Sequence, residues 1–168
     1  LVTQREIGTE SPEEQGLYEV GTVSIIRQIL KLGGSSVRIL VEGVCRAKLC
    51  RLWQTEPYLQ ANVEEIPEEA NLRSGPRTEA LLRRTAILFG RYAELVGGVS
   101  DAAKAMVLES RDPGALADFI AHNCDFRYHE KQAVLEELSP YLRLRQVTEL
   151  LEKENEVLSL QKEMEGKV

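Results

Sequence analysis

The hydrophobic pattern of this chain changes its period once, at Pro67, and that change limits the folds the chain can adopt. Before Pro67 the pattern is β, most clearly over Val37–Leu49, where apolar side chains alternate with a largely charged set. After Pro67 the apolar spacing is helical. Strands followed by helices, without β-α-β alternation, predict an α+β fold. We expect an antiparallel β sheet or partial barrel over residues 1–67, followed by an α-helical bundle with a long C-terminal helix.

Turn signals divide the β region into strands. Gly33–Ser36 predicts a hairpin between a strand within Leu17–Leu32 and the strand that starts at Val37. The first of these strands cannot keep all its aliphatic residues on one face, which predicts a bulge near Arg27 and Gln28. A third strand is expected over Tyr58–Ile66, with Leu59, Ala61 and Val63 on its inner face.

Start and stop signals also divide the helical region. Ser100, Asp112-Pro113 and Ser139-Pro140 each have the composition of a helix N-terminus, and Gly97-Gly98 has that of a helix end. These signals predict a helical subdomain over residues 74–138 and a separate long helix over 139–168. Apolar residues near heptad spacing predict that this last helix projects and contacts a partner or a following domain; they are Leu144, Val147, Leu150, Leu151, Val157 and Leu158. The alternative is an amphipathic helix folded back onto the bundle.

Composition excludes several classes of protein. No apolar run is long enough to span a bilayer, and the first residues do not resemble a secretory signal. Three cysteines cannot form a closed set of disulfides and suit a reducing compartment, such as the cytoplasm. The net charge is −6, from 27 acidic and 21 basic residues, so nucleic acid is not expected as the main partner.

Motifs for catalysis and cofactor binding are absent from the sequence. It contains no Gly-x-x-x-x-Gly-Lys phosphate loop, no Gly-x-Ser-x-Gly elbow and no Cys-x-x-Cys pair. Five arginines between Arg73 and Arg91 form a basic patch, which could meet an acidic partner, the chain's own acidic tail or solvent. We therefore expect no catalytic, cofactor-binding or metal-binding residue, and we interpret the chain as a binding or assembly module. Leu40, Trp53 and Tyr58 are candidate exposed contacts on the sheet.

Several segments carry a resemblance to a known family. They are Leu1–Gln4, Leu17–Val23, Val37–Gly43, Asp112–Ala121 and Glu130–Glu136. In this order and spacing they resemble the N-terminal domain of the Lon ATP-dependent protease, which has a PUA-like β part. The family's further N-terminal strands have no counterpart here, so the resemblance predicts a β part with an open edge.

The resemblance implies a non-catalytic part of a larger machine. In the family, this domain binds unfolded or damaged proteins and helps to assemble a hexamer, while ATP, magnesium and a Ser-Lys dyad belong to other domains. The implied location is the cytoplasm of a bacterium, or the mitochondrial matrix of a eukaryote. Two alternatives remain: a stand-alone adaptor with the same β fold, and an independent small enzyme.

Overall fold

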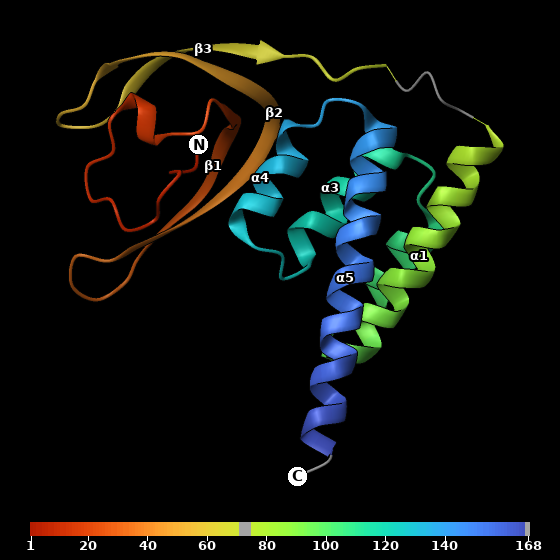
Figure 1. Cartoon of the computed structure of the whole chain (residues 1–168). Coiled ribbons are helices and arrows are strands. Elements are labelled where there is room, and N and C mark those ends of the chain that lie inside the picture. The colour runs from red at the N-terminus through yellow and green to blue at the C-terminus, as the bar shows by residue number, and fades with distance from the viewer. Residues whose placement is uncertain (71–74, 167–168) are drawn as a thin grey trace. The chain divides into compact units, whose positions relative to one another are not determined.

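The computed structural model describes residues 1–70 and 75–166, and the chain divides into two compact units, Leu1–Glu68 and Glu69–Val168 (Figure 1). Strands occupy the first unit and α-helices the second. The predicted α+β class with segregated elements is confirmed. The helices expected over 74–138 and 139–168 belong to one unit and not to two.

The first unit is a three-stranded antiparallel sheet in the order β1-β2-β3. Its strands are β1 (Val20–Lys31), β2 (Val37–Gln54) and β3 (Gln60–Ile66), and a short 3-10 helix, η1 (Glu14–Gly16), precedes β1. The β1–β2 register shifts between Ile26 and Gln28, which confirms the predicted bulge, and shifts again between Val23 and Ser24. These irregularities accompany the curvature of β1 and β2 in Figure 1.

The apolar residues of this sheet have less cover than their alternation suggests. Leu17 and Ala47 are the buried apolar residues among those described in the unit, whereas Val37, Ile39 and Val41 are exposed on β2. On β3, Val63 is also exposed. The alternation of apolar and polar residues therefore predicted the strands correctly. It did not predict burial, because apolar residues expected on the inner face are exposed to solvent in this unit.

The second unit contains five α-helices over its described residues. They are α1 (Pro76–Val96), α2 (Asp101–Glu109), α3 (Pro113–Asn123), α4 (Tyr128–Glu136) and α5 (Pro140–Gly166). The predicted start signals are confirmed at Ser100, which accepts a hydrogen bond from the Ala103 amide, and at Asp112, which accepts from Gly114 and Ala115. Helix α1 ends where Gly97 adopts a φ of 71°, a left-handed conformation that favours glycine.

Helix α5 lies beside α1 and runs parallel to it (Figure 1). The contacts advance together along both helices, from the Thr85–Thr148 hydroxyl pair at 2.7 Å to the Asn155 amide, which donates to the Leu88 carbonyl at 3.0 Å. Further along, Arg91 donates to Ser159 at 3.1 Å. Buried polar pairs lose their hydrogen bonds if the helices slide, so these contacts define the register between α1 and α5.

The expectation that residues 139–168 project as a whole is wrong for the first half of α5. One face of this half is buried as far as Asn155, in a core shared with α1 and α3, and this is the folded-back alternative. An apolar stripe at helical spacing is equally suited to a neighbouring helix of the same chain, and α1 is that helix. The last turns of α5, from Glu156 to Gly166, are mostly exposed.

Candidate protein-binding surfaces

The first residues of the chain lie along the edge of β1. Leu1 and Thr22 exchange backbone hydrogen bonds, with N···O distances of 2.8 and 2.9 Å, and the Tyr18 amide donates to the Thr3 carbonyl at 2.9 Å. This approach requires glycine at position 21, because a Cβ atom there would lie 2.2 Å from the Leu1 carbonyl oxygen. The sequence thus places a short extended segment, Leu1–Gln4, on an edge that the sheet itself leaves open.

An apolar pocket of about 500 Å³ lies between this segment and the sheet. Aliphatic side chains from the N-terminal segment and all three strands form most of its lining. These are Leu1, Val2, Leu17, Val23, Ala47, Leu49, Leu52, Leu59, Ala61 and Val63. Glu19 is the one charged residue among those that line it. Such a lining can accept an aliphatic or aromatic side chain by removing its surface from water, but offers few polar groups to orient a small polar ligand.

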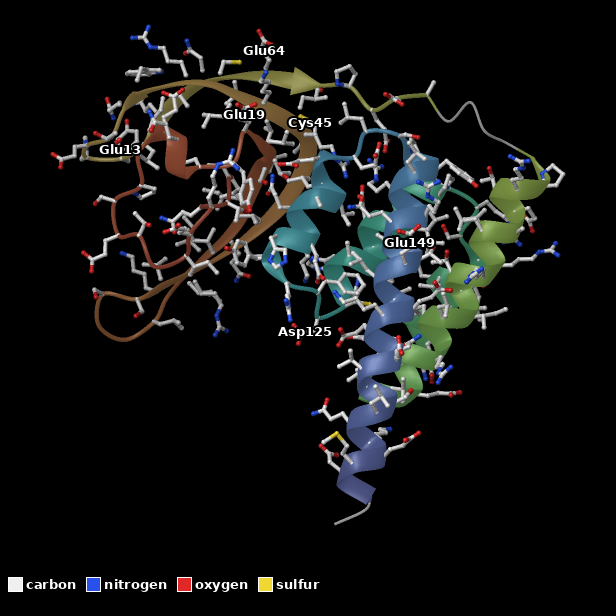
Figure 2. The ribbon with its side chains drawn as sticks, viewed as in Figure 1. Glu13, Glu19, Cys45, Glu64, Asp125 and Glu149 are labelled. Carbon is white, nitrogen blue, oxygen red and sulfur yellow. The ribbon has the colours of Figure 1, made fainter. Side chains whose placement is uncertain are left out.

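A second, polar hollow adjoins the pocket, and Glu19 and Leu49 belong to the lining of both. Glu19 lies 4.0 Å from Lys48, and Glu64 also lines the hollow; Figure 2 labels both acids. Elsewhere on β2, burial raises the pKa of the Cys45 thiol, and the negative charge of Glu65 raises it further. Raised thiol pKa values oppose nucleophilic activation, because the thiolate is the reactive form.

The three sheet residues predicted as contacts are exposed but do not form one surface. Leu40, Trp53 and Tyr58 are each more than half exposed. Trp53 lies near the end of β2 and Tyr58 lies in the β2–β3 connection. Leu40 is thirteen positions from Trp53, or roughly 40 Å along the strand at about 3.3 Å per residue. None of them lines the apolar pocket. The signal for the pocket was the alternation that assigned Leu59, Ala61 and Val63 to an inner face.

The candidate contacts on α5 separate into two groups. Leu144, Val147 and Leu151 are fully buried in the chain's own core, so their prediction as partner contacts is wrong. Leu150 and Leu158 are partly buried against the same core. Val157 is half exposed, and with Leu160 and Met164 it forms an exposed stripe at i, i+3 and i+7 spacing on the last turns.

The basic patch on α1 is largely occupied by the chain itself. Arg84 pairs with Glu152, Arg83 pairs with Glu79 at 2.9 Å, and Arg91 contacts Ser159. The interpretation in which the patch meets the chain's own acidic tail is therefore confirmed for Arg84. Arg73 lies outside the described residues.

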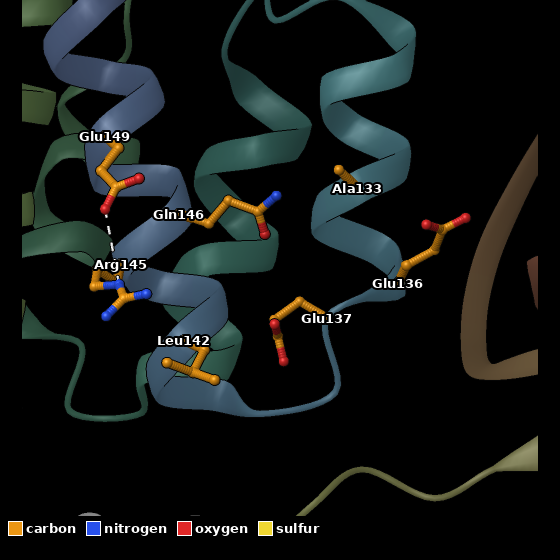
Figure 3. Close-up of a pocket in the computed structure, with 7 residues that line it drawn as sticks. All are labelled: Ala133, Glu136, Glu137, Leu142, Arg145, Gln146 and Glu149. Atoms are coloured by element: carbon orange, nitrogen blue, oxygen red, sulfur yellow. Dashed lines mark ion pairs between the residues drawn. The ribbon is translucent and has the colours of Figure 1, made fainter.

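A hollow between α4 and α5 is acidic, but its carboxylates have partners within the chain (Figure 3). Glu136 accepts a hydrogen bond from Gln132, Glu137 accepts from the Ser139 amide, and Glu149 lies 3.7 Å from Arg145. Over residues 1–70 and 75–166, no three His, Cys, Asp or Glu side chains are grouped so that they could hold a metal ion. In the same ranges, no helix has the length and apolarity needed to cross a bilayer.

Comparison with known proteins identifies the family of the chain that carries these surfaces. A family model for the substrate-binding domain of the ATP-dependent protease La (Lon) matches residues 1–153. The chain belongs to this family. The Lon protease of Syntrophomonas wolfei is 39% identical over the whole chain, and that of Geobacter metallireducens is 35% identical over 96% of it.

Solved structures agree at the level of the fold. The N-terminal domain of Mycobacterium avium complex Lon protease superposes with a TM-score of 0.66 at 22% identity, covering 84% of this chain and 74% of that one. A Lon N-terminal domain protein from Xanthomonas campestris gives a TM-score of 0.53 at 16% identity, covering 81% and 70%. The chain spans about a fifth of the length of the curated Lon proteases that it matches. The predicted resemblance is confirmed.

Proposed function

We propose that this Lon substrate-binding domain captures unfolded or damaged proteins through the apolar pocket of its first unit. One observation carries the proposal: the pocket is lined by aliphatic side chains from four segments, and several of these remain exposed in the folded chain. Unfolded proteins differ from folded ones by their exposed apolar segments, and burial of such a segment is favourable at about 25 cal/mol per Å². Leu59 and Val63, each about half exposed, belong to the accessible part of this surface.

The test is binding of denatured casein to the 168-residue chain, measured by calorimetry. Leu59→Lys and Val63→Lys place charges at the pocket and should weaken binding at least tenfold. Ile87→Lys is the matched control, because Ile87 is 74% exposed on α1 and does not line the pocket. The proposal fails if wild-type chain does not bind casein, or if the pocket variants bind as tightly as the control.

We further propose that the domain acts within a hexameric AAA+ serine protease with a Ser-Lys dyad, which uses ATP and magnesium in the bacterial cytoplasm. The named relatives are bacterial Lon proteases about five times as long as this chain, which supports this placement. Their match along the whole chain favours it over a stand-alone adaptor. The isolated chain should then neither hydrolyse ATP nor cleave casein. Turnover that depends on one of its own side chains would refute the proposal.

The last turns of α5 are the proposed site of self-association. Val157, Leu160 and Met164 present an apolar stripe that faces away from the buried side of the helix. Sedimentation of the wild-type chain and of Leu160→Asp tests this at several concentrations. A smaller mass for the variant is expected, whereas equal masses throughout would contradict the proposal.

A further inference from the structure

The polar hollow of the first unit has a volume of about 590 Å³ and borders the apolar pocket. Leu17, Glu19 and Leu49 line both cavities, so the two share a wall. The hollow lies beside Arg5, which follows the N-terminal segment, and η1 contributes Glu14 to its lining. A segment whose apolar side chain occupies the pocket therefore brings its neighbouring residues to the hollow.

Carboxylates outnumber cations in this hollow. Its charged lining consists of Arg5, Glu14, Glu19, Lys48 and Glu64. The Lys48 ammonium lies 4.0 Å from the Glu19 carboxylate, which is longer than a hydrogen bond, so it compensates that charge only in part. The Arg5 guanidinium lies over the Tyr18 ring, 4.7 Å from its centre. Three negative charges and two positive ones leave the hollow acidic.

Within the described part of the chain, two of these carboxylates have no cationic partner. Glu14 accepts a hydrogen bond from the Leu52 amide at 3.3 Å, and this neutral donor leaves the negative charge uncompensated. Glu64 lies opposite Lys48 in the β2–β3 register, but no ion pair joins the two side chains. Both carboxylates can accept charge-assisted hydrogen bonds from a cationic side chain that enters the hollow.

The charge of the hollow acts on any segment that the pocket binds. A lysine or arginine beside the apolar residue would be attracted, whereas an aspartate or glutamate in the same place would be repelled. Repulsion of one class of segment contributes to specificity as much as attraction of the other does. Glu19 lines both cavities, so it is the charge that adjoins a bound apolar side chain most directly.

We propose that the hollow makes the pocket selective for apolar segments flanked by lysine or arginine, and that Glu19 and Glu64 determine this selectivity. The inference rests on the proposed function and narrows it, from apolar segments in general to those with a basic neighbour. Exposed charge pairs each contribute little, so the preference is a few-fold and not absolute.

Three blocked heptapeptides test the selectivity. Each has a central Val-Leu-Val, with two lysines, two glutamines or two glutamates on each side, so the result does not depend on the direction of binding. In calorimetry with the 168-residue chain, the lysine peptide should bind at least threefold tighter than the glutamine peptide, and the glutamate peptide at least threefold weaker. These differences belong to about 0.1 M salt and should fall below twofold at about 1 M, where the Debye length is about 3 Å. Equal affinities at the lower salt concentration would overturn the proposal.

Variants of equal charge separate the hollow from the net charge of the chain, which is −6. The double variant Glu19→Gln, Glu64→Gln should reduce the preference for lysine over glutamine to less than twofold. The double variant Glu94→Gln, Glu109→Gln is the matched control, because both residues are exposed on helices of the second unit and line neither cavity. If the hollow variant keeps the wild-type preference, or the control loses it, the proposal is overturned.

Replacement of Lys48 should have the opposite effect. Lys48→Gln removes a cation that competes with the bound peptide for Glu19, so the lysine peptide should bind at least twofold tighter than it binds wild type. A purely structural role of Lys48 would weaken all three peptides alike, and that result would overturn the proposal, as would unchanged affinities. Circular dichroism establishes that the variants are folded, and the three peptides decide the proposal on the wild-type chain alone if one is not.

The two proposals can fail separately. If casein binding depends on Leu59 and Val63 but the three peptides bind equally, the pocket recognises apolar segments without regard to charge. If the chain does not bind casein at all, the proposed function itself is wrong.

Discussion

Replacement of Gly21 by alanine should detach the N-terminal segment from the sheet. The new methyl carbon would lie 2.2 Å from the Leu1 carbonyl oxygen and 3.4 Å from the Val2 Cα, both backbone atoms that no rotamer change can move. The segment must therefore shift, and the reciprocal Leu1–Thr22 hydrogen bonds are lost. At about 0.5–1.5 kcal/mol each, they contribute roughly 1–3 kcal/mol to local stability.

Part of this loss is offset in the unfolded state. Alanine restricts the unfolded chain more than glycine does, which stabilises the folded state by about 0.4–1 kcal/mol where the backbone is compatible. The net local cost is then roughly 0–2.6 kcal/mol, so global melting is a poor readout. Native-state hydrogen exchange at the Thr22 amide is a direct one, because that amide donates to Leu1.

The expected result is faster exchange at Thr22 in Gly21→Ala, with unchanged exchange in the second unit. Gly8→Ala is the control, because a Cβ atom at Gly8 meets nothing within 4 Å. If Thr22 exchanges equally slowly in wild type and Gly21→Ala, the close approach does not determine the position of the segment, and the reasoning is refuted.

Three further predictions concern the chain's titratable and buried groups. Burial raises the pKa of the Cys124 thiol to about 12, so alkylation followed by mass spectrometry should label exposed Cys50 first, Cys45 next and Cys124 last; early labelling of Cys124 would contradict its burial. Burial raises the pKa of the Glu130 carboxyl, but the hydrogen bond from the Arg127 amide and the charge of Lys153 outweigh burial, so the net pKa is lowered. Glu130→Gln should therefore destabilise the chain by about 1 kcal/mol at pH 7. Chemical denaturation should show this difference disappearing as the pH falls below 4.5 and through the lower pKa of the folded chain. Arg143→Ala leaves a cavity in place of a fully buried side chain and removes its hydrogen bond to the Glu137 carbonyl, so it should cost about 2–5 kcal/mol. Arg145→Ala, in an exposed pair with Glu149, should cost about 1 kcal/mol or less, and similar denaturation midpoints for the two variants would refute this difference.

Features that depend on neighbouring residues in the sequence were predictable. The caps at Ser100 and Asp112 are local, since each side chain bonds amides two or three residues ahead. The bulge near Arg27 followed from a conflict of phase within one strand.

The partner of an apolar face was not predictable, because the same pattern suits any partner. The stripe containing Leu144, Val147 and Leu151 has the spacing of a helix that contacts another protein, yet α1 and α3 of the same chain cover it. Polar residues distinguish a stripe that packs within the chain from one that binds another protein. Thr148 and Asn155 lie within this stripe, and each has a hydrogen-bonding partner on α1.

The two units differ in how many polar groups their apolar surfaces contain, and in whether the chain itself supplies hydrogen-bonding partners for those groups. Helix α5 has polar residues in its stripe, and α1 supplies Thr85 and the Leu88 carbonyl to satisfy them, so the contact is specific and internal. The lining of the apolar pocket is mostly aliphatic, and Glu19 is the one charged residue among the described residues that form it. A surface of aliphatic side chains with few polar groups favours contact with apolar side chains and sets few polar requirements on their sequence. That difference is the physical reason for the proposal that the first unit captures substrate, while the second unit is an internally packed helical bundle.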